Sequence, residues 1–247
     1  CNASIGVHTA LQDSSPMILF VGQVPREFRR REAFQEIDFE AMFAPVAKWA
    51  VEVDDAARMP EITARAFAVA AGGRPGPVVV SLPEDMLTDE VDVPDAKVAA
   101  NASPEPSDAD IARINDLLST AERPLVIFGG GGWSAEICAE FETFCESNGL
   151  PAVSSFRVMD IFNNDHPNFV GELGYNTNPK LTQRVLDADL LLVIGARLGE
   201  TTSQAYTIVK APRPDQTMIH VYPDHSELGR VFQADLPIAS GIGAFVS

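Results

Sequence analysis

Strand-length apolar runs that alternate with helix-length segments constrain the fold of this chain more than any other feature. Continuous apolar runs suit strands that are covered on both faces, as in parallel sheets. Strands are predicted at 17–21, 47–53, 78–82, 124–128, 151–154, 189–194 and 217–221. Helices are predicted between them at 3–12, 57–71, 108–119 and 134–148. This alternation predicts an α/β fold with doubly wound parallel sheets.

An acidic, proline-containing stretch at 88–107 divides the pattern into two domains. It has few large apolar residues, which favours an extended and solvated linker. We therefore predict one domain at 1–87, the linker at 88–107 and a second domain at 108–247. The chain opens at Cys1 without an initiator methionine and leads directly into a helical pattern, so the first domain is predicted to be incomplete.

The net negative charge of the chain disfavours nucleic acid and anionic membranes as binding partners. The net charge is -17, and so negative a surface repels nucleic-acid backbones and anionic membrane surfaces. No apolar run is long enough to cross a bilayer, and no signal segment opens the chain. Three cysteines without CxxC or metal-ligand spacing predict reduced thiols in a cytoplasmic protein and no metal site.

In the first domain, a group of arginines follows the end of a predicted strand. Gln23 lies just past that strand, and Arg26, Arg29, Arg30 and Arg31 come next. Guanidinium groups bind carboxylates well, so the cluster is a candidate site for a small carboxylate. The alternative is a solvated loop whose arginines neutralise nearby acids.

In the second domain, three strand ends carry residues suited to a ligand, because ligands of such sheets bind beyond the carboxyl ends of the strands. A glycine run at 129–132 lets backbone N–H groups approach an anion or a flat ring. Arg197 could hold a pyrophosphate, and Asp224 could accept hydrogen bonds from a ribose. The predicted cofactor-binding residues are Gly129, Gly130, Gly131, Gly195, Arg197 and Asp224. The alternative is that the glycines only permit tight turns and that Arg197 pairs with a carboxylate.

Conventional catalytic motifs are missing from the sequence. It contains no G-x-S-x-G, P-loop or HExxH. The four histidines are scattered, with no nucleophile and carboxylate in an obvious arrangement: His8, His166, His220 and His225. None of them is assigned a catalytic role.

Four segments follow one another in the first domain: Asn2-Ala3, Asp13-Ser14-Ser15-Pro16-Met17, Gly22-Gln23-Val24-Pro25 and Ala33-Phe34-Gln35-Glu36. Taken in order, they resemble the pyrimidine-binding domain of acetolactate synthases. The end of that domain in the wider thiamine-diphosphate family is matched by Gly73-Arg74-Pro75-Gly76-Pro77-Val78 and Leu82-Pro83-Glu84-Asp85. The second half resembles the family's central domain at Arg123-Pro124, Ala188-Asp189, Gly195-Ala196-Arg197 and His220-Val221-Tyr222-Pro223-Asp224. The resemblance covers nearly the whole chain.

This resemblance implies a piece of an enzyme with three α/β domains. The family's catalytic glutamate precedes the segment seen here, and the GDG…N motif that holds Mg²⁺ and the diphosphate belongs to the third domain. Thiamine diphosphate and Mg²⁺ would thus have their main ligands outside this chain, which alone is expected to be inactive. The full-length enzyme is expected to be a homodimer or homotetramer that decarboxylates a 2-oxo acid such as pyruvate and joins the remainder to a second carbonyl compound.

By position, the resemblance implies a catalytic site that includes Gln23, Phe34, Gln35 and Lys48. Gln23 would lie near the thiazolium and substrate, Phe34 and Gln35 in the active-site wall, and Lys48 in the substrate channel. The central domain of the synthases binds FAD in a structural role, and here Gly195 to Arg197 and Asp224 would line it. The sequence departs from the synthases at 174–178, where they usually have a Gly-Met-His-Gly-Thr-type loop, and at Val221-Tyr222-Pro223-Asp224 in place of Asp-Ile-Asp.

Two other classes of function remain open. A nucleotide-binding oxidoreductase or deacetylase-like domain shares the general architecture of the second half, but it would need GxGxxG with an acidic residue further on, and the sequence lacks this motif. A non-catalytic ligand-binding relative could keep the scaffold without the chemistry, and fold alone does not exclude it.

Overall fold

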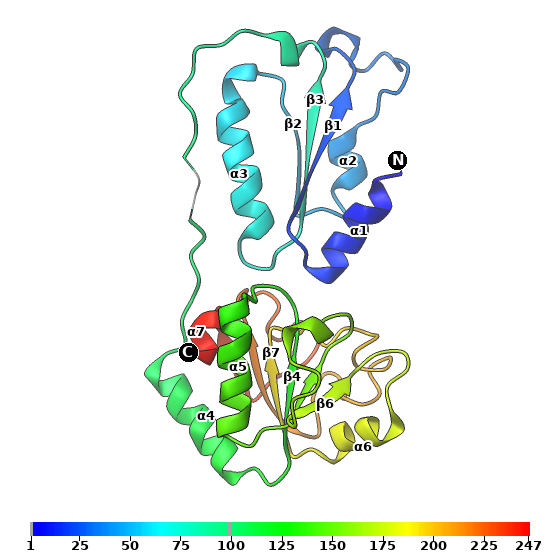
Figure 1. Cartoon of the computed structure of the whole chain (residues 1–247). Helices are drawn as coiled ribbons and strands as arrows, with labels where there is room; N and C mark the ends of the chain where they lie inside the picture. The colour runs from blue at the N-terminus through cyan, green and yellow to red at the C-terminus, as the bar shows by residue number, and fades with distance from the viewer. Residues whose placement is uncertain (1, 98–99) are drawn as a thin grey trace. The chain divides into compact units, whose positions relative to one another are not determined.

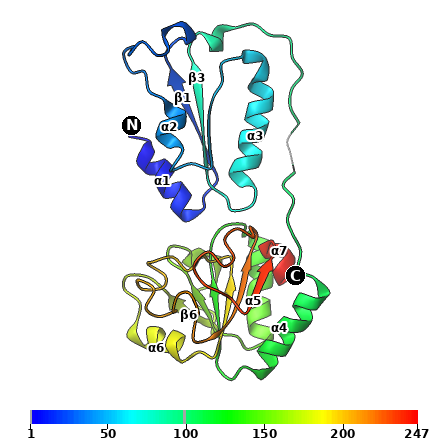
Figure 2. The same ribbon diagram turned by 180° about the vertical axis from the view of Figure 1, so that it is seen from behind.

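A computed structural model describes residues 2–97 and 100–247, and the chain forms two compact units, Cys1–Ala102 and Ser103–Ser247. Each unit is a parallel sheet with helices on both faces (Figures 1 and 2). The predicted α/β fold with two parallel sheets is confirmed. Within the described residues, no helix combines the length and apolar character that crossing a bilayer requires.

The sheet of the first unit has the strand order β1-β3-β2. Its strands are β1 (Met17–Gln23), β2 (Trp49–Glu52) and β3 (Pro77–Pro83), and all pair in parallel. Helix α3 (Met59–Ala71) covers one face, and α1 (Ser4–Asp13) and α2 (Phe39–Phe43) cover the other. Short 3-10 turns lie at Arg26–Phe28, Ala56–Arg58 and Met86–Thr88. The sheet's carboxyl edge therefore gathers the residues that follow β1, β2 and β3.

The core of the first unit follows from the alternation of side chains along β3. Val78 and Val80 pack against the α3 side, whereas Val79 packs with Phe43 on the opposite face. All three valines are fully buried. A strand with apolar residues on both faces is expected only where both faces are covered, as here.

The second unit has a six-stranded parallel sheet with the order β6-β5-β4-β7-β8-β9. Its strands are β4 (Pro124–Phe128), β5 (Ala152–Ser154), β6 (Phe169–Glu172), β7 (Leu190–Ile194), β8 (Thr217–Tyr222) and β9 (Leu236–Ala239). Helices α4 (Asp108–Thr120), α5 (Ala135–Ser147) and α7 (Ile242–Val246) pack on one face, and α6 (Pro179–Asp187) packs on the other. A single-turn 3-10 helix spans Met159–Ile161.

Polar side chains define where the helices of the second unit begin. Ser107 accepts a hydrogen bond from the Asp110 amide, and Asp110 accepts one from the Ser107 amide, which forms a capping box at α4. Ser134 and Asn178 cap α5 and α6 in the same general way. Such caps satisfy amides that have no partner inside the helix.

An aromatic cluster fills the core between β4 and α5. The Phe141 ring lies 5.3 Å from Phe128, 5.4 Å from Phe162 and 5.2 Å from Trp133, measured between centroids. Phe128 and Phe141 are fully buried. These rings anchor α5, and so they fix the glycine-rich connection between β4 and α5.

The cysteines of α5 are unpaired thiols, Cys138 half-buried and Cys145 buried. Burial raises the pKa of Cys145 to about 12. Cys145 is thus part of the core of the unit. The third cysteine, Cys1, lies outside the described residues.

Candidate functional site

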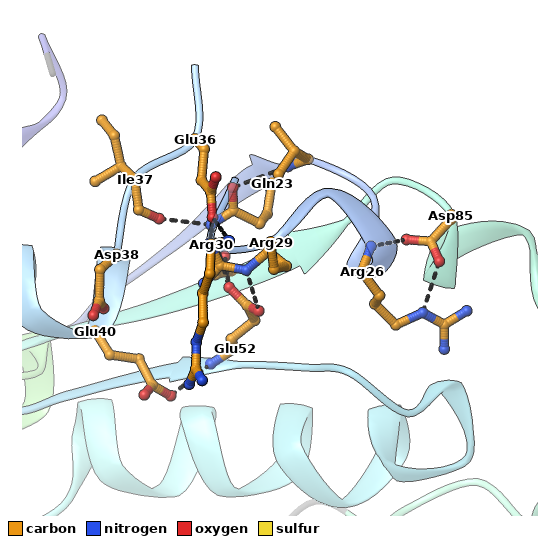
Figure 3. Close-up of polar contacts among 12 residues, drawn as sticks. Gln23, Arg26, Arg29, Arg30, Glu36, Ile37, Asp38, Glu40, Glu52 and Asp85 are labelled. Carbon is orange, nitrogen blue, oxygen red and sulfur yellow. Dashed lines mark hydrogen bonds and ion pairs between the residues drawn. The ribbon is translucent and has the colours of Figure 1, made fainter. Parts of the chain in front are cut away.

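Gln23 lies buried at the carboxyl end of β1, and its side-chain amide is bonded inside the unit (Figure 3). Its Nε2 donates to the Ile37 carbonyl at 2.7 Å and to the Glu52 carboxylate at 3.2 Å, while its Oε1 accepts from the Val24 amide at 2.9 Å. Only 4% of the residue is exposed. In this conformation the Gln23 amide holds neighbouring backbone and side-chain groups in place.

Arg29 forms ion pairs with two carboxylates of its own unit. Its Nε donates to Glu52 at 2.9 Å, and its Nη1 donates to Glu36 at 3.0 Å (Figure 3). The three side chains are mostly shielded from solvent. Arg29 therefore neutralises acids of its own unit.

Arg26 is occupied in the same way. It pairs with Asp85 at 2.7 Å and with Asp89 at 2.8 Å, and its guanidinium holds the pKa of Asp85 below the usual range. For Arg26 and Arg29 the structure favours the alternative, in which the arginines neutralise acids, because acids far along the chain reach them in the fold. Among the described residues, Arg30 and Arg31 form no ion pair and are exposed.

Glu36 shapes the loop that carries Phe34 and Gln35. Its carboxylate accepts hydrogen bonds from the backbone amides of Arg30, Arg31 and Ala33. The Arg30 amide is the main cause that lowers the pKa of Glu36. Phe34 is 89% exposed, and Gln35 is exposed in a left-handed conformation.

Lys48 lies at the other end of the sheet from Gln23. It directly precedes β2, so it is at the amino edge, whereas Gln23 closes β1 at the carboxyl edge. Lys48 Nζ donates to the carbonyls of Val69 and Gly72 at the end of α3. The structure thus brings Gln23 close to the loop of Phe34 and Gln35 but does not bring Lys48 to them.

A depression of about 490 Å³ adjoins this loop. Its lining has more carboxylates than arginines: Arg29, Arg30, Glu32, Glu36, Asp38, Glu40 and Glu52. Glu40 accepts from the Glu52 amide, which ties α2 to β2. The excess of negative charge disfavours a small anion inside this depression.

The second unit has its topological switch point between β4 and β7. From β4 the chain continues to β5 on one side, and it later returns to β7 on the other side. Ligands of such sheets bind at this crevice, beyond the carboxyl ends of the strands. The loops that meet there begin at Gly129 and Gly195, and Gly131 is exposed on the first of them.

Close contact between these two loops requires glycine. A Cβ on Gly130 would lie 2.2 Å from the Gly195 carbonyl oxygen, and one on Gly195 would lie 2.4 Å from the Gly129 carbonyl oxygen. Their φ angles are 72° and 68°, in the left-handed region that glycine tolerates best. The loops' own packing thus accounts for Gly130 and Gly195, as the alternative reading of the sequence expected.

Arg197 follows Gly195 and pairs with a buried carboxylate. Its Nε lies 2.9 Å from Glu227, which also pairs with Arg230 at 2.7 Å. Asp224 lies after β8 at the same edge of the sheet and accepts from the Ser226 amide at 2.9 Å. Sequence reasoning did not identify Glu227, although the acid three residues after Asp224 was the available signal.

The side chain of His220 on β8 is hydrogen-bonded to the loop that carries Arg197. Its ring Nε2 lies 2.9 Å from the Ala196 carbonyl oxygen, and the residue is buried. A carbonyl oxygen can only accept, so Nε2 donates and the neutral ring has its proton there. Burial lowers the pKa of His220.

The stability of the second unit is expected to fall as the pH drops through His220's titration range. The unfolded histidine takes up a proton near pH 6.5, whereas the folded one does so only at lower pH. Between these two pH values the unfolded state binds more protons, so the free energy of unfolding rises with pH and is lost toward acid. Denaturant titrations at several pH values from 5 to 8 give the free energy of unfolding as a function of pH. Its rise with pH should be smaller for His220→Gln than for the wild type. His225→Gln is the control because its side chain is 90% exposed; equal slopes for wild type and His220→Gln would contradict the expectation.

Within residues 2–97 and 100–247, no three His, Cys, Asp or Glu side chains gather into an arrangement for a metal ion. At the carboxyl edge of the first sheet, the side chains of Gln23, Arg29 and Glu52 are instead bonded to each other and to neighbouring groups. The network of Glu36, Glu52 and Arg29 was not recognised in the sequence, where Arg29 was predicted to meet a substrate carboxylate and Glu52 was not singled out. Its partners come from separate strands and loops, which spacing does not reveal.

Comparison with known proteins places these features in a family. The model of the thiamine pyrophosphate enzyme central domain matches residues 111–247, which is most of the second unit. A probable acetolactate synthase large subunit of Methanocaldococcus jannaschii is 30% identical over 96% of the chain and 41% of its own length. The acetolactate synthase large subunit of Parasynechococcus marenigrum is 34% identical, over 98% and 40%.

A glyoxylate carboligase of Escherichia coli O157:H7 is 31% identical over 95% of the chain and 40% of its own length. The chain therefore spans about 40% of the length of these curated relatives. The matches extend across both units, and the family model covers more than half of the chain. The chain belongs to the thiamine pyrophosphate enzyme family and contains its central domain.

Proposed function

We propose that this chain is part of a thiamine-diphosphate-dependent enzyme that decarboxylates a 2-oxo acid and joins the remainder to a second carbonyl compound. An acetolactate synthase-like reaction with pyruvate is the favoured form. The observation that carries the proposal is the similarity to proteins named acetolactate synthase over both units, not over the central domain alone. The glyoxylate carboligase at a similar identity supports carboligation as the shared chemistry.

The cofactor of the proposed enzyme is thiamine diphosphate with Mg²⁺, whose main ligands belong to parts of the protein outside this chain. When bound, the cofactor supplies the carbon nucleophile and the electron sink that decarboxylation needs. An exposed phenyl ring on a fixed loop fits a neighbouring flat group, and Phe34 offers such a ring. Phe34 and Gln35 would face the reacting compounds.

In this proposal the residues of the first unit bind and orient. Gln35 has an amide that can donate to a carbonyl oxygen, and Phe34 can exclude water from one side. Gln23 supports this edge from inside through its bonds to Ile37 and Glu52. Arg30 and Arg31 are exposed, so they can attract an anionic substrate toward the loop. Lys48 lies at the opposite edge of the sheet, so its proposed place in the substrate channel draws no support from this arrangement.

FAD at the central domain is a second part of the proposal. The switch point between β4 and β7 supports it, because dinucleotides bind at such crevices and the backbone of the glycine run at 129–132 lies there. Gly129, Gly130, Gly131 and Gly195 would approach the ligand through backbone, with Arg197 and Asp224 at the rim. Arg197 is already oriented by Glu227.

We further propose that the full-length protein is a cytoplasmic homodimer or homotetramer. The unpaired thiols Cys138 and Cys145 support a reducing compartment. Light scattering of the purified full-length protein measures the number of subunits. The alternatives of an oxidoreductase or a non-catalytic relative have no observation in their favour.

The full-length protein is expected to consume pyruvate only when thiamine diphosphate and Mg²⁺ are both added after dialysis against a chelator. Carbon dioxide release and acetolactate formation are followed together, and glyoxylate replaces pyruvate in a parallel reaction to identify the substrate. The visible spectrum of the same preparation after denaturation tests for released flavin. Pyruvate and glyoxylate left unconsumed by folded, cofactor-supplied protein would contradict the proposed activity, and a spectrum without flavin would contradict FAD.

A further inference from the structure

The side-chain carboxylate of Glu36 accepts hydrogen bonds from several backbone amides of the loop 29–36. Glu36 accepts from the Arg30 amide, from the Arg31 amide at 3.3 Å and from the Ala33 amide at 3.2 Å. A carboxylate that accepts several backbone N–H groups fixes the chain around it, because charge-assisted hydrogen bonds are the strong ones. Gln35 immediately precedes this carboxylate in the sequence.

The backbone of this loop is in conformations that it would not adopt unaided. Arg30, Glu32 and Gln35 have φ angles of 65°, 56° and 67°, although none of them is glycine. Left-handed conformations of such residues persist only where the surroundings determine them. Phe34 contributes little to this, since it is 89% exposed and has almost no packing of its own. The hydrogen bonds to the Glu36 carboxylate therefore shape the loop, together with the turn that the Glu36 amide closes on the Ala33 carbonyl at 2.9 Å.

A chain of polar contacts ties Glu36 to the sheet. Arg29 bridges Glu36 and Glu52 at 3.0 and 2.9 Å. Glu52, the last residue of β2, also accepts from Gln23 at 3.2 Å and lies 3.4 Å from the Ser81 hydroxyl. The contacts run from the ends of the strands to the loop (Figure 3). Arg29 thus links the loop to the ends of the strands through Glu36 and Glu52.

We propose that Glu36 is a positioning residue: it sets how Phe34 and Gln35 are presented to the acceptor of the condensation. Arg29 links Glu36 to the sheet. This inference rests on the proposed function, in which Phe34 and Gln35 face the reacting compounds. Glu36 itself touches neither substrate nor cofactor. Its effect is on whether the second carbonyl compound is held in the orientation that bond formation needs.

The test uses Glu36→Gln in the full-length protein and has two readouts. In hydrogen exchange, the amides of Arg30, Arg31 and Ala33 are expected to exchange about tenfold faster, because an uncharged amide is a weaker acceptor than a carboxylate. The amides of β3 are expected to exchange as in the wild type.

The second readout is the ratio of products. Two molecules of pyruvate normally give one condensed product and one carbon dioxide. A loosened acceptor site lets the two-carbon remainder leave as acetaldehyde after taking up a proton, so the ratio of carbon dioxide to condensed product is expected to rise about twofold or more.

Matched variants separate positioning from general damage. Glu27→Gln removes the same charge from an exposed side chain in the same connection, and it is expected to leave both readouts unchanged. Arg29→Lys keeps the charge but loses the fork that reaches two carboxylates, so it is expected to move both readouts in the direction of Glu36→Gln. It also serves as the second variant should Glu36→Gln fold poorly.

The outcomes distinguish this inference from the function on which it rests. Exchange and product ratio equal to those of Glu27→Gln would overturn the role of Glu36. Faster exchange throughout the first unit would overturn it too, because the effect would then be structural. If the wild type converts neither pyruvate nor glyoxylate, the proposed function fails, and the exchange of the loop amides alone decides whether Glu36 holds the loop.

Discussion

Gly130→Ala is expected to destabilise the second unit by about 2 to 4 kcal/mol. The added Cβ would lie 2.2 Å from the Gly195 carbonyl oxygen, which belongs to backbone and cannot swing aside. Alanine is also unfavourable at a φ of 72°. Both loops at the switch point must move to relieve the overlap, so we expect a local rearrangement of the proposed cofactor crevice as well as a loss of stability.

Denaturant titration followed by tryptophan fluorescence measures this loss. A Trp49→Phe background leaves Trp133 as the reporter, because the chain has two tryptophans and only Trp133 lies in the second unit. Gly199→Ala is the matched control, since no atom lies within 4 Å of its added Cβ and its φ is outside the left-handed region. The control is expected to change stability by no more than about 0.5 kcal/mol. Equal midpoints for Gly130→Ala and Gly199→Ala would contradict the requirement for glycine.

Phe141→Ala is expected to cost about 3 to 5 kcal/mol of the second unit's stability. The ring is fully buried and lies against Phe128, Phe162 and Trp133 at 5.2 to 5.4 Å between centroids. Its removal loses the transfer free energy of the ring and leaves a cavity, because the neighbouring rings are held by β4 and the segments around them. Helix α5 would lose its main contact with the sheet.

Leu186→Ala provides the comparison for a large apolar side chain on the surface. Leu186 is 46% exposed on α6, so its truncation is expected to cost about 1 kcal/mol or less. Both variants are measured by denaturant titration with circular dichroism, because loss of Phe141 also changes the surroundings of Trp133. A cost for Phe141→Ala as small as that for Leu186→Ala would show that the aromatic cluster does not hold α5.

The interior of both sheets could be predicted because its strands are covered on both faces. The run at 189–194 is the plainest case, and the structure has β7 at Leu190–Ile194 with every residue buried. Helix α5 likewise falls within the predicted 134–148. In such segments the local apolar pattern and the tertiary packing demand the same residues, so the pattern is sufficient.

The elements that were missed lie at the margins of the sheets or are short. Strands β6 and β9 are the edges of the second sheet, with Gly171 in one and Pro237 in the other, and edge strands tolerate both residue types. Helix α6 has nine residues and buries Leu181 and Val185, whose spacing of four residues was the available signal. Helices α2 and α7 have five residues each, too few to establish a helical period.

The candidate site was predicted in composition but not in its bonding. The sequence showed arginines close together, and the fold supplied the acids that occupy them, Glu52 and Asp85, from distant strands and turns. For Lys48 the topology was decisive, because a residue before a parallel strand and one after it lie at opposite edges. Burial of Gln23 could not be foreseen either, since it depends on Glu52 and Ile37 as partners.

The shared pairing of Arg29 with Glu36 and Glu52 also predicts strong epistasis in the first unit. Substitution of Arg29 leaves two shielded carboxylates without their cation, and that costs more than the pairs contribute when intact, whereas substitution of either acid leaves Arg29 paired with the other. Substitutions made together would remove the uncompensated charge, so their effects should not add. Engineering of this edge for a new acceptor would therefore require Arg29, Glu36 and Glu52 to be replaced together. Libraries that change one residue at a time would lose the destabilised single variants.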